Sequence, residues 1–446
     1  MFKLSKCSIL LSLIVCFSFI FRILLIFWGS FPPSSDLGLH NSVVYSITQS
    51  GNTDFLWNYY NMGEGVSLTF PGYHIFVSYI IILTGLPEYL VHSLVAAFFS
   101  SFIILVAFLI TRKISNTSAA LIVAFLAAFS RFDIEMLMWG GYPNVVTLML
   151  IPLAFYLLMQ RQNLSLPSFL VITSLVYSAI FLTHSLSMAI FVVIVFVAFI
   201  FITIVPKTFA VRRLHSFVWI LPLFFGVLII FPFVVDAVPT ILNANSGVLT
   251  GNTLNLRLAT LSTQTVNWDF IYPLFFYFIA IFLFSKKQNG KFFTIPVFLL
   301  VLWILVPAVG SQSHLLGFYT DYNRFRYFVY LPIIIVYGIV FDCASGFFAK
   351  LINTGLSKTE TFSKLNGKTK KLVFWIRPIL TRKTIYAFFI LILLLYSLFS
   401  VSMFLTPSKG IEMQEYYQIM NEPLYDAMQW IKANTSPDSI IASDAR

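Results

Sequence analysis

Residues Ser34–Gly51 read SSDLGLHNSVVYSITQSG, and they place polar and ionisable side chains between two long apolar segments of the chain. The two prolines directly before this stretch exclude a helix upstream, whereas the run LHNSVVYSI is compatible with one. Ser34 or Ser35 can cap the start of that helix, and Gly51 can end it. The stretch therefore predicts a short helix just outside a membrane.

Asp36 and His40 are four residues apart, so a helix places the carboxylate and the imidazole on one face, where both can meet one ligand. The alternative is an interfacial amphipathic helix whose aspartate is simply solvated. Arg22, near the outer end of the first apolar segment, is expected to pair with an acid such as Asp36 or to snorkel.

The composition excludes a soluble globular protein. The 446 residues are 59% apolar and only 10% charged, whereas soluble domains carry about 25% charged residues. We therefore expect an all-α polytopic membrane protein. Its net charge of +11 does not indicate nucleic-acid binding, because the lysines and arginines gather beside the apolar segments, as the positive-inside rule describes.

Twelve apolar segments are candidates for membrane helices. They cover residues 7–29, 72–87, 89–111, 117–131, 142–159, 167–183, 185–206, 216–235, 270–285, 292–310, 325–342 and 384–405. The outer loop that ends near Phe70 and the inner pair Arg112–Lys113 require an odd number of crossings between them. We therefore expect the short segment 72–87 to be re-entrant or steeply tilted, which leaves eleven spans.

The basic residues predict the orientation of the chain. Lys3 and Lys6 hold the N-terminus on the cytoplasmic side, and residues 343–383 form a basic cytoplasmic loop that can touch anionic lipids. The multi-spanning domain is expected to cover residues 1–405, with residues 30–70 as an external loop. Nearly all the unusual polar residues then lie on the external side.

The C-terminal segment, residues 406–446, has a different pattern. Residues 412–432 have amphipathic helical spacing, ANTSPDS breaks it, and IIAS resembles the start of a buried strand. We expect an external soluble domain whose remainder is missing or is supplied by a separate chain, because a helix and one strand cannot bury a core. An interfacial amphipathic tail is the alternative.

Three short motifs in this layout resemble the GT-C superfamily. They are DLGLH at residues 36–40, FPGYH at residues 70–74 and the acidic motif RFDIE at residues 131–135. Residues 427–437 are also similar to the segment that opens the external domain of oligosaccharyltransferase subunits. The resemblance implies a multi-spanning glycosyltransferase that uses a lipid-phosphate-linked sugar, as oligosaccharyltransferases, protein O-mannosyltransferases and aminoarabinose transferases do.

The chain also departs from that pattern. It has no WWDYG-like motif, its first acidic motif lacks the adjacent Asp-Glu pair of the mannosyltransferases, and GGYPN at residues 140–144 has no counterpart with a role. The subfamily therefore stays open, and so does an inactive relative.

The resemblance implies sugar transfer to a protein, glycan or lipid acceptor, with Asp36 as the base or as a metal ligand. The residues predicted to hold a divalent metal, Mn²⁺ or Mg²⁺, are Asp36, His40, Asp133 and Glu135. Solvation of the two later acids, or their neutralisation by Arg131, is the alternative.

Arg324, Arg326 and His184 are predicted to bind the donor phosphate, because arginine matches phosphate with a bidentate fork and a charge at the start of a span needs a partner. Snorkelling by Arg326 and helix capping by His184 are the alternatives. The residues predicted to contact substrate are Glu64, Tyr73 and His74. Glu64 could equally be a solvated loop acid.

Two other classes of protein stay open. A secondary transporter would have a similar number of spans, but it usually has internal repeats, and none is evident here. A non-catalytic membrane scaffold would tolerate alanine at Asp36, Arg324 and Arg326. The gathering of polar residues on one face favours catalysis at a membrane surface.

Overall fold

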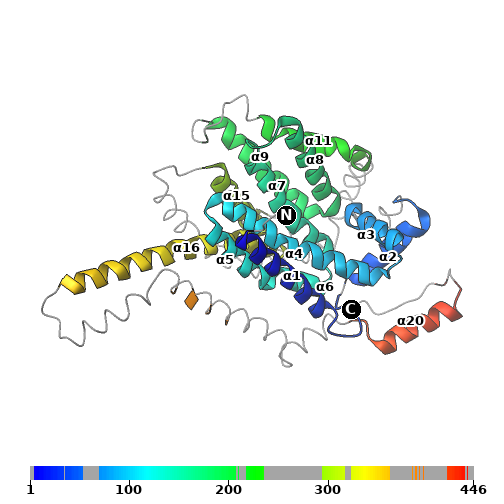
Figure 1. Ribbon diagram of the computed structural model, residues 1–446. Coiled ribbons are helices and arrows are strands. Elements are labelled where there is room, and N and C mark those ends of the chain that lie inside the picture. Colours follow the sequence, from blue (N-terminus) through cyan, green and yellow to red (C-terminus); the bar gives the residue numbers. More distant parts are fainter. Residues whose placement is uncertain are drawn as a thin grey trace.

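The computed structural model is a bundle of α-helices (Figure 1). It describes residues 5–34, 36–53, 70–206, 209, 217–235, 294–316, 323–361 and 419–436, and the single residues 384, 387, 388, 391, 395 and 439. No strand occurs among these residues. Six helical segments in the described parts are long and apolar enough to cross a membrane. The prediction of an all-α polytopic membrane protein is confirmed.

The bounds of the helices follow the apolar runs of the sequence. The α-helices are α1 (Lys6–Ile26), α2 (Leu37–Ser50), α3 (Pro71–Thr84), α4 (Glu88–Ile114), α5 (Thr117–Ala128), α6 (Arg131–Trp139), α7 (Tyr142–Met159), α8 (Leu166–Thr183), α9 (Ser185–Ile204), α11 (Leu221–Ile229), α15 (Ile295–Gly310), α16 (Asn323–Thr361) and α20 (Glu422–Asn434). Two 3-10 turns are η2 (Phe217–Trp219) and η3 (Ser313–Leu316). The predicted segment 142–159 coincides with α7. Segment 270–285 and most of 384–405 lie outside the described residues.

One predicted boundary is wrong. The span expected at residues 325–342 belongs to α16, which runs for 39 residues, so residues 343–361 of the predicted basic loop are helical. These residues contain no proline, and most of them are compatible with a helix. Nothing therefore ends the helix at the point where the apolar run ends. Residues 362–383 of the predicted loop lie outside the described residues.

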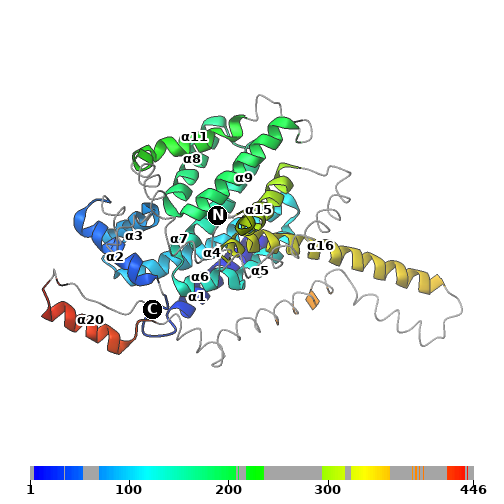
Figure 2. The ribbon, with the colours of Figure 1, turned by 180° about the vertical axis from the view of Figure 1, so that it is seen from behind.

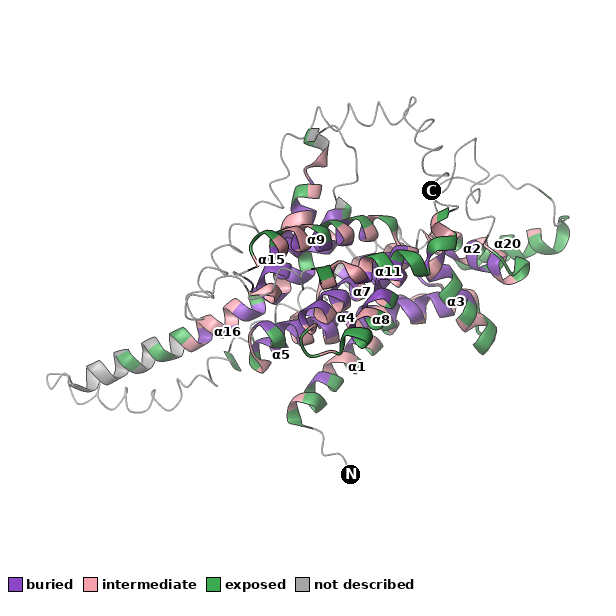
Figure 3. Ribbon diagram, turned by 90° about the horizontal axis from the view of Figure 1, so that it is seen from above, coloured by how far each residue is buried: buried purple, intermediate pink, exposed green. Residues whose placement is uncertain are grey.

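The core of the bundle is formed by α4 and α7. Of their most apolar windows, 67% of α4 and 83% of α7 are buried, compared with 17% of α1. Figure 3 shows this as buried ribbon concentrated on α4 and α7. Small residues on α4, such as Ala96, Ala97 and Ser100, are fully buried and let neighbouring helices approach closely.

The predicted external helix is α2, and it is followed by the short helix α3. Gly51, with φ of 68°, ends α2, and Gly85, with φ of 66°, ends α3. Both values lie in the left-handed region that glycine adopts without strain. The 14 residues of α3 measure about 21 Å, less than the roughly 30 Å of a hydrocarbon core. A helix of this length is too short to cross the core, and the re-entrant or steeply tilted path of residues 72–87 stays a prediction. α2 and α3 lie together at one end of the bundle (Figures 1 and 2).

A buried ion pair joins three helices inside the bundle. Arg22 of α1 and Asp133 of α6 are 0% and 1% exposed. Arg22 Nη2 lies 2.6 Å from Asp133 Oδ2, and Nε lies 3.1 Å from the same oxygen. The Ser100 hydroxyl of α4 also bonds this oxygen, and Arg22 Nη1 donates to the Ala128 carbonyl at 3.2 Å. The pair therefore ties α1 and α6 to the central helix.

This pair corrects the expectation that Arg22 bonds to Asp36. The predicted carboxylate partner exists, but it is Asp133. Asp36 precedes α2, ten residues after the end of α1, whereas α6 packs directly against the outer part of α1. Arg22 therefore pairs with Asp133, which is distant in sequence but adjacent in the fold, and not with the nearby Asp36.

We expect replacement of either partner to destabilise the protein, because it leaves an unpaired charge in an apolar interior. Arg22→Met should cost about 3–5 kcal/mol, whereas the double variant Arg22→Met/Asp133→Leu should cost less than the single one. Thermal unfolding of purified protein in detergent measures both. A double variant that loses as much as the two single variants together would contradict the structural role of the pair.

Candidate functional site

The start of α2 lies against the turn between α6 and α7. The Ser34 hydroxyl oxygen, from one of the two predicted capping residues, accepts hydrogen bonds from the backbone N–H of Leu37 at 2.6 Å and of Asp36 at 3.1 Å. The N–H of Asp36 also lies 3.3 Å from the Trp139 carbonyl oxygen. Gly140 has φ of 88°, and a Cβ there would overlap Ser34 Oγ and lie 3.2 Å from Asp36 Cβ. Only glycine allows this close approach.

His40, one turn after Asp36, is buried between α3 and the same turn. Its Nε2 lies 3.0 Å from the Gly140 carbonyl oxygen, and its Nδ1 lies 2.9 Å from His74 Nε2. A carbonyl only accepts, so His40 Nε2 carries the proton and Nδ1 accepts from His74. Burial lowers the pKa of His40 to about 4, against an opposing effect of the Gly140 hydrogen bond. His40 is therefore neutral at pH 7.

Behind His40 lies a group of buried rings that we call the histidine cluster: His40, His74, His92, Tyr73 and Tyr142. The Tyr73 hydroxyl lies 2.7 Å from His92 Nδ1. The ring centroid of Tyr142 lies 5.9 Å from that of His40 and 6.1 Å from that of His92. These residues come from α2, α3, α4 and α7, so the cluster holds α2 and α3 onto α4 and α7.

His184 occupies the joint between α8 and α9. Its Nδ1 accepts from the Ser187 N–H at 3.3 Å and lies 2.9 Å from the Ser187 hydroxyl, so it caps the start of α9, as one of the predicted alternatives had it. Burial, then the positive charge of Arg324 and the ring of His40, lower the pKa of His184 to about 3. The neutral ring therefore carries its proton on Nε2.

The first residues of α16 reach the same end of the bundle. The Tyr327 ring lies 6.5 Å from the ring of Trp139, next to Gly140. Arg324 is exposed and Arg326 is half-buried. Besides burial, the positive charge of Arg324 and the ring of His40 both lower the pKa of His184. We call Asp36, His40, His184 and Arg324 the Asp36 site.

The carboxylates predicted to hold a divalent metal do not converge. Among the described residues, no three His, Cys, Asp or Glu side chains are placed to hold a metal ion. Asp133 and Glu135 lie on the helix α6, where residues two apart point about 200° apart. Asp133 pairs with Arg22 through Oδ2, so this oxygen is not available to bind a metal together with Asp36 and His40. The described residues therefore do not fit the predicted metal site.

The residues predicted to contact substrate divide into two groups. Glu64 lies outside the described residues. Tyr73 and His74 are 1% and 3% exposed, and their side chains face His92 and His40. This burial argues against direct contact with a substrate and gives both residues a supporting position behind His40.

Several residues of this end were not singled out from the sequence as site residues. They are His92, Gly140, Tyr142 and Ser187, and each of them makes a ring contact or a hydrogen bond with a neighbouring residue at this end. His92 had a usable signal, because a histidine within an apolar run needs a polar partner. The run GGYPN had another, because a pair of glycines before a proline-led helix marks a tight turn.

Solved structures place this architecture among known folds. Archaeal oligosaccharyltransferase AglB from Archaeoglobus fulgidus, in complex with an inhibitory peptide and a dolichol-phosphate, is similar with a TM-score of 0.56 at 16% identity, over 96% of this chain and 58% of that chain. Its apo form is similar with a TM-score of 0.53 at 16% identity, over 97% of this chain and 58% of that chain. ArnT from Cupriavidus metallidurans, bound to undecaprenyl phosphate, is similar with a TM-score of 0.50 at 13% identity, over 96% of this chain and 81% of that chain.

The fold is therefore that of the GT-C glycosyltransferases, as the sequence resemblance implied. The chain spans 58% of the length of the archaeal oligosaccharyltransferase that it resembles. It belongs to a family of unknown function, DUF6541, which it matches over residues 5–446. No curated protein matches it.

We expect Gly140→Ala to displace the start of α2. An alanine with this positive φ would cost about 1 kcal/mol in the backbone alone, and its Cβ would overlap Ser34 Oγ. A lower melting temperature in detergent is the expected result. Gly38→Ala is the matched control, because a Cβ at Gly38 in α2 meets nothing within 4 Å. Equal effects of the two substitutions would contradict the proposed close contact.

The low pKa of His184 predicts a loss of stability in acid. The unfolded chain binds a proton at this histidine below about pH 6.5, whereas the folded protein does so only near pH 3. Stability should therefore fall as pH decreases from 6.5 to 4, by at most about 1.4 kcal/mol per pH unit. His184→Asn keeps a helix-capping side chain but cannot titrate, so its unfolding midpoint should depend less on pH. An unchanged pH dependence would contradict the assignment.

Proposed function

We propose that the chain is a membrane glycosyltransferase that takes a sugar from a polyprenyl-phosphate-linked donor. One observation supports this most: Asp36, His40, His184 and Arg324 meet at one end of a GT-C fold. Two proteins with this fold, AglB and ArnT, have been solved with dolichol-phosphate and undecaprenyl phosphate. Transfer from a lipid phosphate requires a base and a cation that holds the phosphate, and Asp36 and Arg324 are the candidates at this end of the bundle.

The reaction is a displacement at the anomeric carbon of the sugar. A nucleophilic oxygen or nitrogen of the acceptor forms the new bond to that carbon, and the bond from the carbon to the phosphate oxygen breaks. The electron pair of the broken bond leaves with the polyprenyl phosphate. A single displacement inverts the configuration at this carbon.

Each residue of the Asp36 site has a different role in this proposed reaction. The Asp36 carboxylate accepts the proton that the acceptor loses. Arg324 holds the phosphate as its negative charge grows. Arg326, two residues further along α16, points about 200° away from Arg324 and does not share this position. His184 offers its Nε2–H to a phosphate oxygen, because its Nδ1 is already engaged by Ser187. His40, fixed by Gly140 and His74, supports the start of α2.

The proposed site faces the outside of the cell or compartment. The basic residues Lys6, Arg112 and Lys113 lie at the opposite end of the bundle, which the positive-inside rule places on the cytoplasmic side. The acceptor, a protein, glycan or lipid, would then meet the enzyme on the external face, where α20 also lies through contacts of Glu422 with Ser30 and of Tyr425 with Phe31.

Loss of the Asp36 carboxylate should reduce transfer by at least about 100-fold, the usual contribution of a positioned base. The measurement is transfer of radiolabelled sugar from a polyprenyl-phosphate donor in membranes that carry wild type or Asp36→Asn at equal expression. Asp426→Asn is the matched control, because Asp426 is an exposed acid on α20 outside the site. It should leave transfer unchanged.

Other results of this assay would redirect the proposal. Transfer that does not depend on the chain, over varied donors, would favour a scaffold or a transporter. Transfer that survives in Asp36→Asn would keep the enzyme and reject the base. A parallel arm with a chelator, then with Mg²⁺ or Mn²⁺ restored, tests the divalent metal that the sequence predicted.

A further inference from the structure

A second candidate site lies at the basic end of the bundle. It is a cavity of about 290 Å³ between the first turns of α1, the last turns of α4 and the start of α5. Along α4, Arg112 beside this cavity and His92 in the histidine cluster are twenty residues apart, which is about 30 Å. The cavity is therefore separated from the Asp36 site by about the thickness of a membrane.

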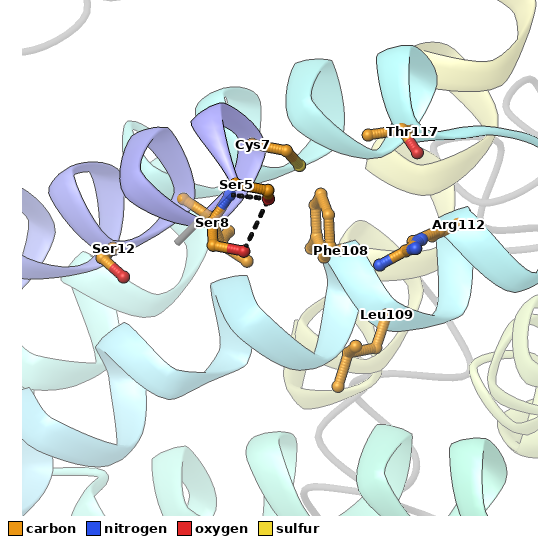
Figure 4. Close-up of a pocket in the computed structure, with 9 residues that line it drawn as sticks. Ser5, Cys7, Ser8, Ser12, Phe108, Leu109, Arg112 and Thr117 are labelled. Carbon is orange, nitrogen blue, oxygen red and sulfur yellow. Dashed lines mark hydrogen bonds between the residues drawn. The ribbon is translucent and has the colours of Figure 1, made fainter. Parts of the chain in front are cut away.

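The lining of the cavity suits an anion. The guanidinium of Arg112 points toward it from one side, and the side chains of Ser5 and Ser8 face it from the other (Figure 4). The hydroxyls of Ser12 and Thr117 also line it, and none of the lining residues is acidic. A cation and several hydroxyl donors around one space are the groups that bind a phosphate.

Arg112 lacks an internal partner. Among the residues that the structure describes, no side chain or carbonyl forms a hydrogen bond or an ion pair with its guanidinium, whereas Arg22 on the facing helix is fully engaged. The five N–H donors of Arg112 are thus available, and their planar fork matches two oxygens of a phosphate.

Two helices also begin beside the cavity. Ser5 caps α1 by accepting from the Ser8 N–H at 3.1 Å, and Asn116 caps α5 by accepting from the Ala119 N–H at 2.9 Å. The positive ends of both helix dipoles therefore point toward this region and add to the field of Arg112.

The surroundings of the cavity are apolar and uncovered. Phe108 and Leu109 line its wall, and Ile9, next to Ser8 on α1, is 48% exposed. In a membrane such side chains face acyl chains rather than water. A ligand with a phosphate head and apolar tails therefore matches both parts of the site.

We propose that this cavity binds the headgroup phosphate of an anionic phospholipid from the leaflet at the basic end, with Arg112 as its main anchor. The hydroxyls of Ser5, Ser8 and Thr117 complete the polar contacts, and the acyl chains lie along α1 beside Ile9. The proposal does not rest on the proposed sugar transfer. Free inorganic phosphate shares the headgroup chemistry and is distinguished by experiment.

The test compares melting temperatures of delipidated full-length protein in detergent, with phosphatidylglycerol, phosphatidylcholine or inorganic phosphate added. Phosphatidylglycerol should raise the melting temperature of wild type by about 2 °C or more, and phosphatidylcholine should raise it less. Arg112→Gln should lose the shift. Lys113→Gln, the matched control, removes an adjacent exposed charge that does not line the cavity, and should keep it.

Three results would overturn the proposal: an equal shift in Arg112→Gln, an equal shift with phosphatidylcholine, or an equal shift with inorganic phosphate alone. If Arg112→Gln fails to fold, Ser8→Leu serves instead, because it fills the cavity and leaves the charge and the Ser5 cap in place. Its expected result is the same loss of the phosphatidylglycerol shift, and retention of the shift would reject the site.

Discussion

The buried ion pair between Arg22 and Asp133 supports the candidate site from inside the bundle. A charge in an apolar interior has to be neutralised, and here the neutralisation fixes the position of α6 against α1 and α4. The end of α6 supplies the Trp139 and Gly140 carbonyls, which accept from the Asp36 backbone and the His40 ring. The placement of the outer helix α2 thus depends on a contact made one layer deeper.

The helices themselves were largely predictable, because their signals are local. Proline at the first turn and glycine after the last turn bound α3, and the apolar run of residues 142–159 coincides with α7. The continuation of α16 past residue 342 was missed, since an apolar run marks where a helix is buried and not where it ends. A helix without a stop signal continues into the polar region.

The candidate site was predictable only in part. The spacing of Asp36 and His40 indicated their common face, and the topology expected from the basic residues placed His184 and Arg324 on the same side. The partner of Asp133 could not be predicted, because Arg22 lies 111 residues away and several acids were available to it. Asp133 and Glu135 were predicted to hold a metal ion together. Helical geometry separates the two carboxylates, and this is visible only once α6 is known to be a helix.

The helix α16 is unusually long for a membrane helix. Its 39 residues measure about 58 Å, roughly twice the thickness of a hydrocarbon core. The helix begins beside the Asp36 site and projects beyond the rest of the bundle at its other end (Figures 1 and 2). Pro332 lies inside this helix and is a point at which it can bend. A bend of about 10° there would swing the far tip, about 44 Å away, by about 8 Å. Small rearrangements at the start of α16 would thereby become visible at the opposite end of the bundle.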